Sequence, residues 1–351
     1  MTFDLQSLVR PNIRNLKPYS SARSEFEGSA EVFLDANENA FGSPAGFGLN
    51  RYPDPLQREL KERIAAMKTV SPSQIFVGNG SDEAIDLLFR IFCEPGRDEV
   101  ITCPPTYGMY RVSADINDVA VREVRLTNDF QLDLPAIRSS ISDAMKLIFI
   151  CSPNNPTGNA MSRDSLIEIA RNFAGIVVVD EAYIDFANEP SVIDELDDLP
   201  NLIVLQTLSK AWGMAGVRVG LAIASTEIIA LFNLVKPPYN VSGLAQQAVI
   251  DALDQETTVK GWIDSGKAER VRLDNLLSGF DFVERVYPSD ANFLLVKVDD
   301  ANELYRYLID KRIVVRNRNN VELCDGCLRI TVGTQEENDR LLAALGSFRN
   351  K

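Results

Sequence analysis

The sequence of 351 residues contains no histidine. This absence excludes serine and cysteine nucleophiles activated by histidine, and metalloproteases that bind zinc through an H-E-x-x-H helix. It also excludes histidine as a general base. Any proton transfer that the protein catalyses must therefore use a lysine, aspartate, glutamate, tyrosine or cysteine side chain.

Positive charge is also scarce. The chain has 36 lysines and arginines against 50 aspartates and glutamates, which gives a net charge of -14. Such a balance repels the phosphate backbone of nucleic acids and anionic lipid surfaces, so we expect neither nucleic acid nor a membrane as a partner. A small anionic substrate is compatible with it, because salt screens a distant acidic surface within about 10 Å and a few arginines can dominate a cleft.

Long apolar runs and paired cysteines are missing too. No stretch approaches the roughly 18 apolar residues that span a bilayer, and residues 1–10 lack the apolar core of a secretory signal, so we expect a cytoplasmic protein. Five cysteines imply no disulfide framework. Cys324 and Cys327 form a C-x-x-C pair, but no second pair and no histidine completes a zinc site, so we interpret both as structural and expect no metal.

Short apolar runs alternate with helix-like stretches in the first two thirds of the chain. The runs are QIFVG (74–78), EVITC (99–103), KLIFIC (146–151), IVVVD (176–180), LIVLQT (202–207) and GLAIA (220–224). This alternation predicts an α/β fold with a mainly parallel sheet that is covered on both faces. Sheets of this kind bind ligands at the carboxyl ends of their strands.

The pattern changes after Pro237 and Pro238, and predicts a second, smaller α+β domain. Two long helical stretches come first, at 244–254 and about 259–278, followed by the strand candidates NFLLVKV (292–298), RIVVR (312–316) and CLRITV (327–332). We therefore place a large domain at residues 45–240. The small domain, which includes an N-terminal arm, is placed at residues 1–44 and 241–351.

The segment IVVVDEAY (176–183) is a buried strand that ends in acidic residues. A buried carboxylate is costly without a cationic partner, so Asp180 should face a positive group. The strand at 202–207 leads into Lys210, and a glycine-rich loop around Arg218 follows. A lysine at a strand end near an aspartate indicates a covalent bond to an aldehyde cofactor.

Pyridoxal phosphate needs a lysine that bonds its aldehyde, an acid that keeps its pyridine nitrogen protonated, and a phosphate cup. Lys210 and Asp180 would supply the first two. At residues 78–82 a strand runs into a helix, and backbone amides at a helix N-terminus bind a phosphate dianion. Taken alone, the serine of this turn would be interpreted as a helix N-cap. Together with the lysine and the aspartate, the turn predicts a phosphate cup formed by Gly80, Ser81 and Asp82.

Three segments resemble the signatures of fold-type I aminotransferases in order and spacing: SPNNPTG (152–158), DEAY (180–183) and TLSKAWGMAGVRVG (207–220). Four more are similar to segments of histidinol-phosphate aminotransferases: LDANEN (34–39), NRYPDP (50–55), CPPTYGMY (103–110) and CLRITVG (327–333). The resemblance covers nearly the whole chain. It implies a fold-type I protein with a large domain built on a seven-stranded sheet. The implied reaction, a step of histidine biosynthesis, converts L-histidinol phosphate and 2-oxoglutarate into imidazole acetol phosphate and L-glutamate.

The resemblance also implies roles for individual residues. The catalytic residues are Lys210, Asp180 and Tyr183, and the cofactor ring contacts Asn155, Tyr183 and Tyr107. The resemblance implies a homodimer with shared active sites. The cofactor phosphate is bound by Thr207, Ser209, Arg218, the amides of Ser81 and Asp82, and Tyr52 of the neighbouring subunit. The substrate contacts Arg329, Asn155, Tyr19, Asn37 and Arg316.

Three alternatives stay open on the sequence alone. An aromatic amino-acid aminotransferase and a threonine-phosphate decarboxylase resemble this family in the same cofactor motifs. A non-catalytic small-molecule-binding protein or regulator is the alternative from another class. Regulators on this fold usually carry an added DNA-binding domain, for which the sequence has no room, and Lys210 is intact. The sequence does not give the relative rates on histidinol phosphate and aromatic amino acids.

Overall fold

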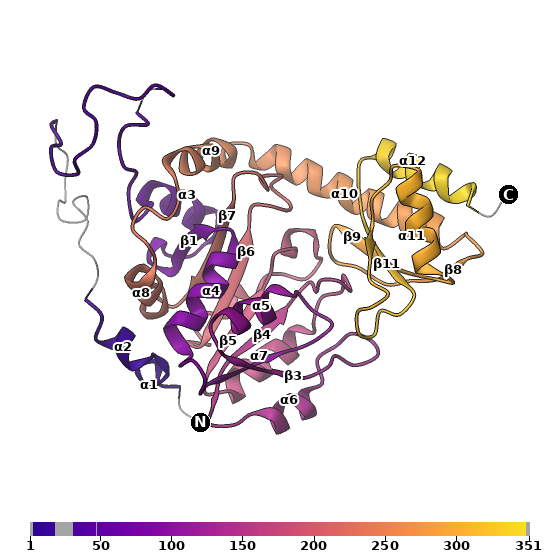
Figure 1. Cartoon of the computed structure of the whole chain (residues 1–351), viewed down its shortest axis with the longest axis horizontal. Helices are drawn as coiled ribbons and strands as arrows, with labels where there is room; N and C mark the ends of the chain where they lie inside the picture. The colour runs from indigo at the N-terminus through magenta and orange to yellow at the C-terminus, as the bar shows by residue number, and fades with distance from the viewer. Residues whose placement is uncertain (1–2, 18–30, 47, 349–351) are drawn as a thin grey trace.

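The computed structural model describes residues 3–17, 31–46 and 48–348. These residues form two sheets with helices packed around them, joined by one long helix that crosses the top of the view (Figure 1). In the same ranges, no helix is both long and apolar enough to cross a membrane. The twelve α-helices of the described part are α1 (Leu5–Leu8), α2 (Pro11–Arg14), α3 (Arg58–Lys68), α4 (Ser81–Phe92), α5 (Met109–Ile116), α6 (Leu134–Ser140), α7 (Arg163–Asn172), α8 (Thr226–Val235), α9 (Gly243–Leu253), α10 (Glu256–Leu277), α11 (Ala301–Asp310) and α12 (Gln335–Gly346).

The larger sheet has seven strands in the order β1-β7-β6-β5-β4-β2-β3. Its strands are β1 (Ile75–Asn79), β2 (Glu99–Thr102), β3 (Ala120–Glu123), β4 (Met145–Cys151), β5 (Ile176–Asp180), β6 (Leu202–Thr207) and β7 (Val219–Ala224). The neighbours from β3 to β6 pair in parallel, whereas β7 runs antiparallel to both β6 and β1. The predicted α/β fold with a mainly parallel sheet is confirmed.

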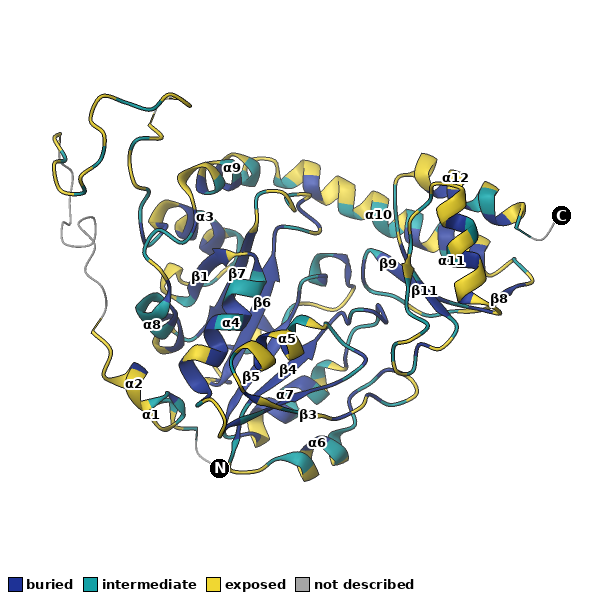
Figure 2. Cartoon of the chain, viewed as in Figure 1, coloured by how far each residue is buried: buried dark blue, intermediate teal, exposed yellow. Residues whose placement is uncertain are grey.

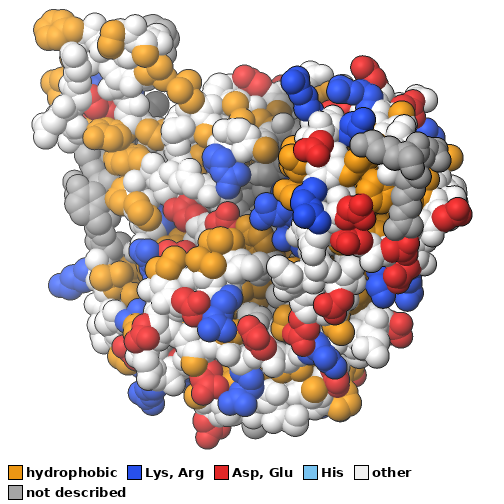
Figure 3. All heavy atoms as spheres, turned by 45° about the vertical axis from the view of Figure 1, so that its right-hand side comes forward, with side chains coloured by type: hydrophobic (Ala, Val, Ile, Leu, Met, Phe, Trp, Pro, Cys, Tyr) orange, Lys and Arg blue, Asp and Glu red, His pale blue; other side chains and the backbone are white. Residues whose placement is uncertain are grey.

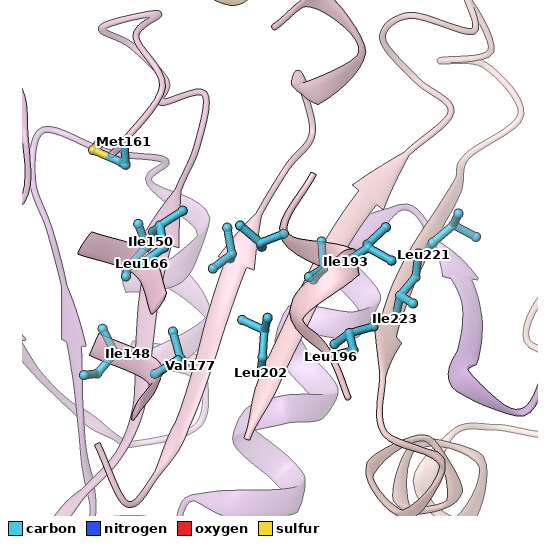
Figure 4. Close-up of a cluster of buried hydrophobic side chains, with 14 of the residues drawn as sticks. Ile148, Ile150, Met161, Leu166, Val177, Ile193, Leu196, Leu202, Leu221 and Ile223 are labelled. Atoms are coloured by element: carbon cyan, nitrogen blue, oxygen red, sulfur yellow. The ribbon is translucent and has the colours of Figure 1, made fainter. Parts of the chain in front are cut away.

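The central strands are apolar throughout because helices cover both faces of the sheet. Side chains alternate between the faces along each strand. Ile148 and Ile150 of β4 accordingly belong to one buried cluster, and Leu147 and Phe149 belong to the cluster on the opposite face. Figure 4 shows the first cluster, with side chains of β4, β5, β6 and β7 in a row. Figure 2 shows the strands as the buried layer and the helices exposed along one side only.

The edge strand β3 was missed by the sequence analysis. Its four residues are exposed or half-buried, so the segment lacks the apolar run that marks the other strands. It pairs only with β2. An edge strand needs no apolar side chains on an uncovered face, and hydropathy therefore does not reveal it.

The smaller sheet is antiparallel, in the order β10-β11-β9-β8. Its strands are β8 (Val283–Val286), β9 (Phe293–Val298), β10 (Arg316–Asn317) and β11 (Cys327–Thr331). The predictions for β9 and β11 are confirmed, and β8 was missed because none of its four residues is fully buried.

The predicted strand RIVVR (312–316) is wrong except for its last residue. The amides of Arg312 and Ile313 donate to the carbonyls of Ile309 and Leu308, so these residues terminate α11 instead of extending a sheet. Val314 is 79% exposed. Pairing starts only at Arg316, opposite Arg329 of β11.

Segments that we assigned to the small domain also pack on the large sheet. Val9 and Ile13, in or beside the short N-terminal helices, lie in the same buried cluster as Phe232 of α8. Val249 of α9 lies in the cluster on the other face. The division at residues 44 and 240 stays a prediction.

The 22-residue helix α10 ties the two sheets together. Its buried Arg270 donates from Nη1 to the carbonyl of Phe186, at 3.3 Å, and to that of Ala291, at 2.7 Å. One carbonyl follows β5 of the large sheet and the other precedes β9 of the small sheet. A single guanidinium therefore contacts both parts beside the site described next.

Candidate active site

A cavity of about 780 Å³ lies where strands β4, β5 and β6 end, between the large and small sheets. Thirteen of the predicted site residues line it: Gly80, Ser81, Asp82, Tyr107, Asn155, Asp180, Tyr183, Thr207, Ser209, Lys210, Arg218, Arg316 and Arg329. Parallel strands bring their carboxyl ends to one edge of the sheet, which is why residues far apart in the sequence meet here. Figure 3 shows Lys and Arg side chains gathered near the middle of the face that carries the small sheet.

Asp180 ends β5 and is buried, with 3% of its surface exposed. Its Oδ2 accepts a hydrogen bond from Tyr110, at 2.7 Å, and its Oδ1 accepts one from the amide of Ala182, at 3.1 Å. Burial raises the pKa of the Asp180 carboxyl to about 6, although both hydrogen bonds oppose the shift. No lysine or arginine in the described ranges forms an ion pair with it, so this buried anion is suited to a cationic ligand.

Lys210 stands three residues beyond β6 and is exposed to the cavity. Its Nζ lies 5.6 Å from the centre of the Tyr183 ring. The surrounding protein desolvates the amine and, together with the positive charge of Arg329, lowers the pKa of Lys210, while Asp180 opposes the shift. A lowered pKa makes the neutral, nucleophilic amine more abundant near neutral pH.

The turn between β1 and α4 forms a cup for an anion. Gly80 is the residue before the helix, and no side chain caps the helix there. The first amides of a helix have no partner inside the helix, so those of Ser81 and Asp82 are free to bind an anion. Arg218 lies beside the turn and donates to Ser209 Oγ at 3.4 Å, with Asp82 Oδ2 at 3.7 Å.

Two glycines allow this close approach. Gly80 has φ +74°, a left-handed conformation that glycine adopts without strain, and a Cβ at this position would lie 2.7 Å from Arg218 Nη2. A Cβ at Gly220 of β7 would collide with the backbone of Gly80 and Ser81. Larger residues at either position would push the cup away from the arginine.

A hydrogen-bonded chain links Tyr183, which follows a strand of the large sheet, to Arg329 of the small sheet. Asn155 Nδ2 donates to the Tyr183 hydroxyl at 3.3 Å, and Arg329 Nη1 donates to Asn155 Oδ1. On the opposite wall the Tyr107 hydroxyl donates to Asp82 Oδ1 at 3.1 Å. Burial and the nearby carboxylate of Asp82 raise the pKa of Tyr107, which keeps its hydroxyl protonated.

Two residues of the site were missed by the sequence analysis. Tyr110 lies inside the quoted segment CPPTYGMY, three positions after Tyr107 and on the same side of the helix start, but a buried tyrosine gives no signal of its partner. Arg318 also lines the cavity. It follows Arg316 at the spacing of alternate strand residues, which was the available signal.

Two predicted residues, Tyr52 and Asn37, are not brought to the cavity within the described part of the chain, and a third falls outside that part. Tyr52 is 51% exposed and stacks on Tyr239 with 4.6 Å between ring centres. Asn37 lies in an exposed loop with φ +54°. Tyr19 lies outside the described residues. All three assignments stay predictions.

The residues that line the cavity fit pyridoxal phosphate. The buried Asp180 carboxylate has hydrogen-bond donors but no ion-pair partner in the described ranges, as a site for a protonated ring nitrogen requires. The uncapped helix start and Arg218 offer a phosphate cup, and Lys210 offers an amine with a lowered pKa. The distances and charges thus match the three needs of the cofactor.

Comparisons with known proteins agree with this arrangement. A family profile described as aminotransferase class I and II matches residues 27–345. A histidinol-phosphate aminotransferase of Parabacteroides distasonis is 56% identical over 346 residues, which is 99% of this chain and 99% of that protein. At this identity and coverage the two chains share one family.

Solved structures agree with the fold. The crystal structure of the histidinol-phosphate aminotransferase from Clostridium acetobutylicum has a TM-score of 0.80 at 27% identity, over 86% of this chain and 92% of that one. A second structure is that of the Sinorhizobium meliloti histidinol-phosphate aminotransferase in complex with pyridoxal-5'-phosphate. It has a TM-score of 0.79 at 25% identity, over 89% of each chain.

Proposed function

The chain belongs to the class I and II aminotransferases and, among them, to the histidinol-phosphate aminotransferases, and from this membership we propose its reaction. It transfers the amino group of L-histidinol phosphate to 2-oxoglutarate, giving imidazole acetol phosphate and L-glutamate. Pyridoxal 5'-phosphate is the proposed cofactor. One observation carries the proposal: Asp180, Lys210 and Arg329 line the same cavity.

Residues of the large sheet would hold the cofactor. Asp180 would bind the pyridine nitrogen, and Asn155 and Tyr183 the phenolic oxygen. The ring would lie against Tyr107, and the phosphate would be bound by the amides of Ser81 and Asp82 and by the side chains of Thr207, Ser209 and Arg218. When bound, the cofactor supplies an aldehyde that exchanges amines and a ring that withdraws electrons from the substrate carbon.

Lys210 is the proposed general base and acid. Its Nζ takes the proton from the substrate carbon that carries the amino group and returns a proton on the cofactor side. The lowered pKa of Lys210 favours the form that accepts a proton. A lysine base also agrees with the absence of histidine from the chain.

Arg329 is the proposed receptor for the anionic end of both substrates. A guanidinium can bind the phosphate of one substrate and the carboxylate of the other, because its planar fork matches both geometries. The Arg329 side chain lines the cavity, and its Nε has no hydrogen-bond partner among the described residues. Arg316, which lies opposite Arg329 across the β10–β11 pair, adds a second positive charge.

The proposed active unit is a cytoplasmic homodimer in which Tyr52 reaches the cofactor phosphate of the neighbouring subunit. Support comes from the exposed apolar side chains in the segment before Tyr52. Val32, Leu34 and Phe41 are 71%, 87% and 102% exposed. Figure 1 shows this segment extending away from the body at the upper left. Apolar surface of this extent marks an interaction site in a stable protein.

One panel of assays tests the proposed reaction against its alternatives. Purified protein with added cofactor and 2-oxoglutarate is offered histidinol phosphate, phenylalanine, tyrosine and threonine phosphate in parallel. We expect kcat/KM to be highest for histidinol phosphate and to be accompanied by glutamate formation. A higher value for the aromatic amino acids, or carbon dioxide release from threonine phosphate, would replace the proposal with the corresponding alternative.

A further inference from the structure

Arg318 is a third arginine at the substrate end of the cavity, beside Arg316 and Arg329. We propose that Arg318 is a specificity-determining residue that favours a phosphate dianion over a carboxylate at this site. The inference rests on the proposed function, in which one site accepts a phosphate ester in one half-reaction and a carboxylate in the other. It adds a residue whose contribution differs between the two.

The backbone positions the three guanidinium groups together. Arg316 and Arg329 are directly opposite each other in the antiparallel pair of β10 and β11. Arg318 is two residues further along, and its amide donates to the carbonyl of Cys327 at 2.9 Å, which extends the pairing beyond β10. Side chains two residues apart on an extended segment point to the same face. All three arginines accordingly line the same cavity.

This arrangement is unfavourable without a bound anion. Like charges directly opposite each other destabilise an antiparallel pair. None of the three side chains forms an ion pair in the described part of the chain. The Nε atoms of Arg318 and Arg329 are both buried and lack a hydrogen-bond partner among the described residues. A ligand with several acceptor oxygens would accept hydrogen bonds from the guanidinium groups that line the cavity and relieve the repulsion.

The electrostatics around Arg318 point the same way. Desolvation, followed by the charges of Arg329 and Arg316, lowers the pKa of Arg318 to about 10, and the opposing effects of Cys324 and Tyr183 are smaller. At neutral pH the guanidinium is still charged. Three positive charges exceed what a single carboxylate neutralises, whereas a phosphate ester carries nearly two negative charges and three acceptor oxygens.

The geometry of the two anions explains the expected selectivity. A carboxylate has two oxygens and is satisfied by one bidentate guanidinium, so Arg329 suffices for glutamate. The third oxygen and second charge of a phosphate ester leave room for a further donor. Arg318 would therefore stabilise the bound phosphate and contribute little to the bound carboxylate.

The kinetic test compares Arg318→Gln, Arg318→Lys and a matched control, Arg306→Gln, in the cofactor-loaded protein. Arg306 is exposed on α11, and its Nε donates only to the carbonyl of Asn302. We expect Arg318→Gln to raise KM for histidinol phosphate about tenfold, the size of a charge-assisted hydrogen bond of roughly 1.4 kcal/mol, with kcat and the KM for glutamate within about twofold. The lysine variant should be intermediate, and the control should match the parent. Equal effects on both substrates, or no effect on either, would overturn the inference.

A binding test does not depend on turnover. The dissociation constants of propyl phosphate and butyrate are measured by titration calorimetry between about pH 5 and pH 7.5, across the second ionisation of a phosphate ester near pKa 6. Propyl phosphate should bind more tightly as pH rises, and Arg318→Gln should reduce this gain while butyrate binding stays the same. Tyr183 and Cys324, which face Arg318, do not titrate in this window, because the pKa values of both groups are raised. Lys210 is common to all variants and cancels in the comparison.

The two tests separate the inference from the proposed function. If the parent protein does not turn over histidinol phosphate but binds propyl phosphate through Arg318, the reaction is wrong and the dianion site is right. If it turns over histidinol phosphate and Arg318→Gln weakens the binding of propyl phosphate and butyrate equally, the reaction stands and the inference fails. If Arg318→Gln shows no cooperative unfolding transition and is therefore not stably folded, the same comparison is made with Arg318→Lys. The lysine variant keeps the charge and loses only the planar fork.

Discussion

The hydroxyl of Tyr110 donates a hydrogen bond of 2.7 Å to Oδ2 of Asp180, and the Tyr110 side chain is completely buried. The ring also stacks on Phe149 of β4, with 5.0 Å between ring centres. This tyrosine thus anchors the buried carboxylate of Asp180, which lines the cavity. Its hydrogen bond lowers the pKa of Asp180 against the effect of burial, and so favours the anion that a protonated ring nitrogen requires.

Replacing Tyr110 with Phe should lower kcat while leaving KM nearly unchanged. The ring stacking survives and the donor is lost, and a hydrogen bond to a charged group contributes roughly 1.5–3 kcal/mol. We expect kcat to fall about tenfold or more. Tyr307→Phe is the matched control, because it removes a tyrosine hydroxyl bond to Ala344 in the small domain. Wild-type kcat in Tyr110→Phe would show that Asp180 does not need this donor.

The pKa of Asp180 predicts a pH-dependent effect on stability in cofactor-free protein. The folded state holds a proton on Asp180 up to about pH 6, against an ordinary value of 3.8. Between these values the folded state binds more protons than the unfolded state, so stability falls as pH rises and the full penalty, roughly 3 kcal/mol, is present above pH 6. Asp180→Asn should therefore be more stabilising at pH 7.5 than at pH 4, as measured by denaturant unfolding.

With cofactor bound, Asp180→Asn should destabilise the protein relative to the parent instead of stabilising it. The Asn variant lacks the charge that pairs with the ring nitrogen, so it should bind cofactor more weakly. Its kcat should fall by an amount that corresponds to several kcal/mol of activation free energy. An equal stability difference at both pH values in cofactor-free protein would contradict the raised pKa of Asp180.

Lys210 should be the residue that bonds the cofactor. Protein loaded with pyridoxal phosphate should be yellow, and borohydride reduction should attach the cofactor to the peptide that contains Lys210. Lys210→Ala should bind cofactor through the phosphate cup and lose turnover by orders of magnitude, because the general base is gone. Lys260→Ala, at an exposed position of α10, is the control and should behave as the parent. Labelling of a different lysine would refute the assignment.

Removing Arg329 should raise KM for histidinol phosphate and for glutamate alike. One guanidinium binds both anions in turn, and each loses its fork in Arg329→Ala. The variant also frees Asn155, to which Arg329 Nη1 donates, so a modest loss of kcat should accompany the effect. Steady-state kinetics on both half-reactions measure this. An effect on one substrate alone would require a separate anion site, for which Arg316 is the first candidate.

Subunit exchange should test the shared active site. An inactive Lys210→Ala chain is mixed with a Tyr52→Ala chain, whose own activity is expected to be low. By two-fold symmetry each site receives Tyr52 from the opposite chain, so one site of the mixed dimer has both residues intact and activity should partly return. If exchange is confirmed by mass and no activity returns although Tyr52→Ala is severely impaired, the shared site does not exist.

The sequence by itself determined the central architecture and the chemistry of the cofactor end. Strands such as IVVVD and LIVLQT lie between two layers of helices, so burial makes them apolar on both faces and their bounds are evident from hydropathy. Asp180 and Lys210 follow directly at strand ends. Because parallel strands end at one edge, local pattern was enough to predict that these side chains meet.

Only the tertiary structure decided where segments with weak local patterns go. The run RIVVR has strand propensity, yet its first two residues end a helix, because no neighbouring strand pairs with it before Arg316. The edge strand β3 has no apolar run because none of its four residues is fully buried. Packing likewise decided that Tyr110 contacts Asp180 and that Arg318 joins two other arginines at the cavity. A hydrogen bond between residues 70 positions apart, or a cluster of like charges between two sheets, depends on the relative placement of whole elements, which local composition does not encode.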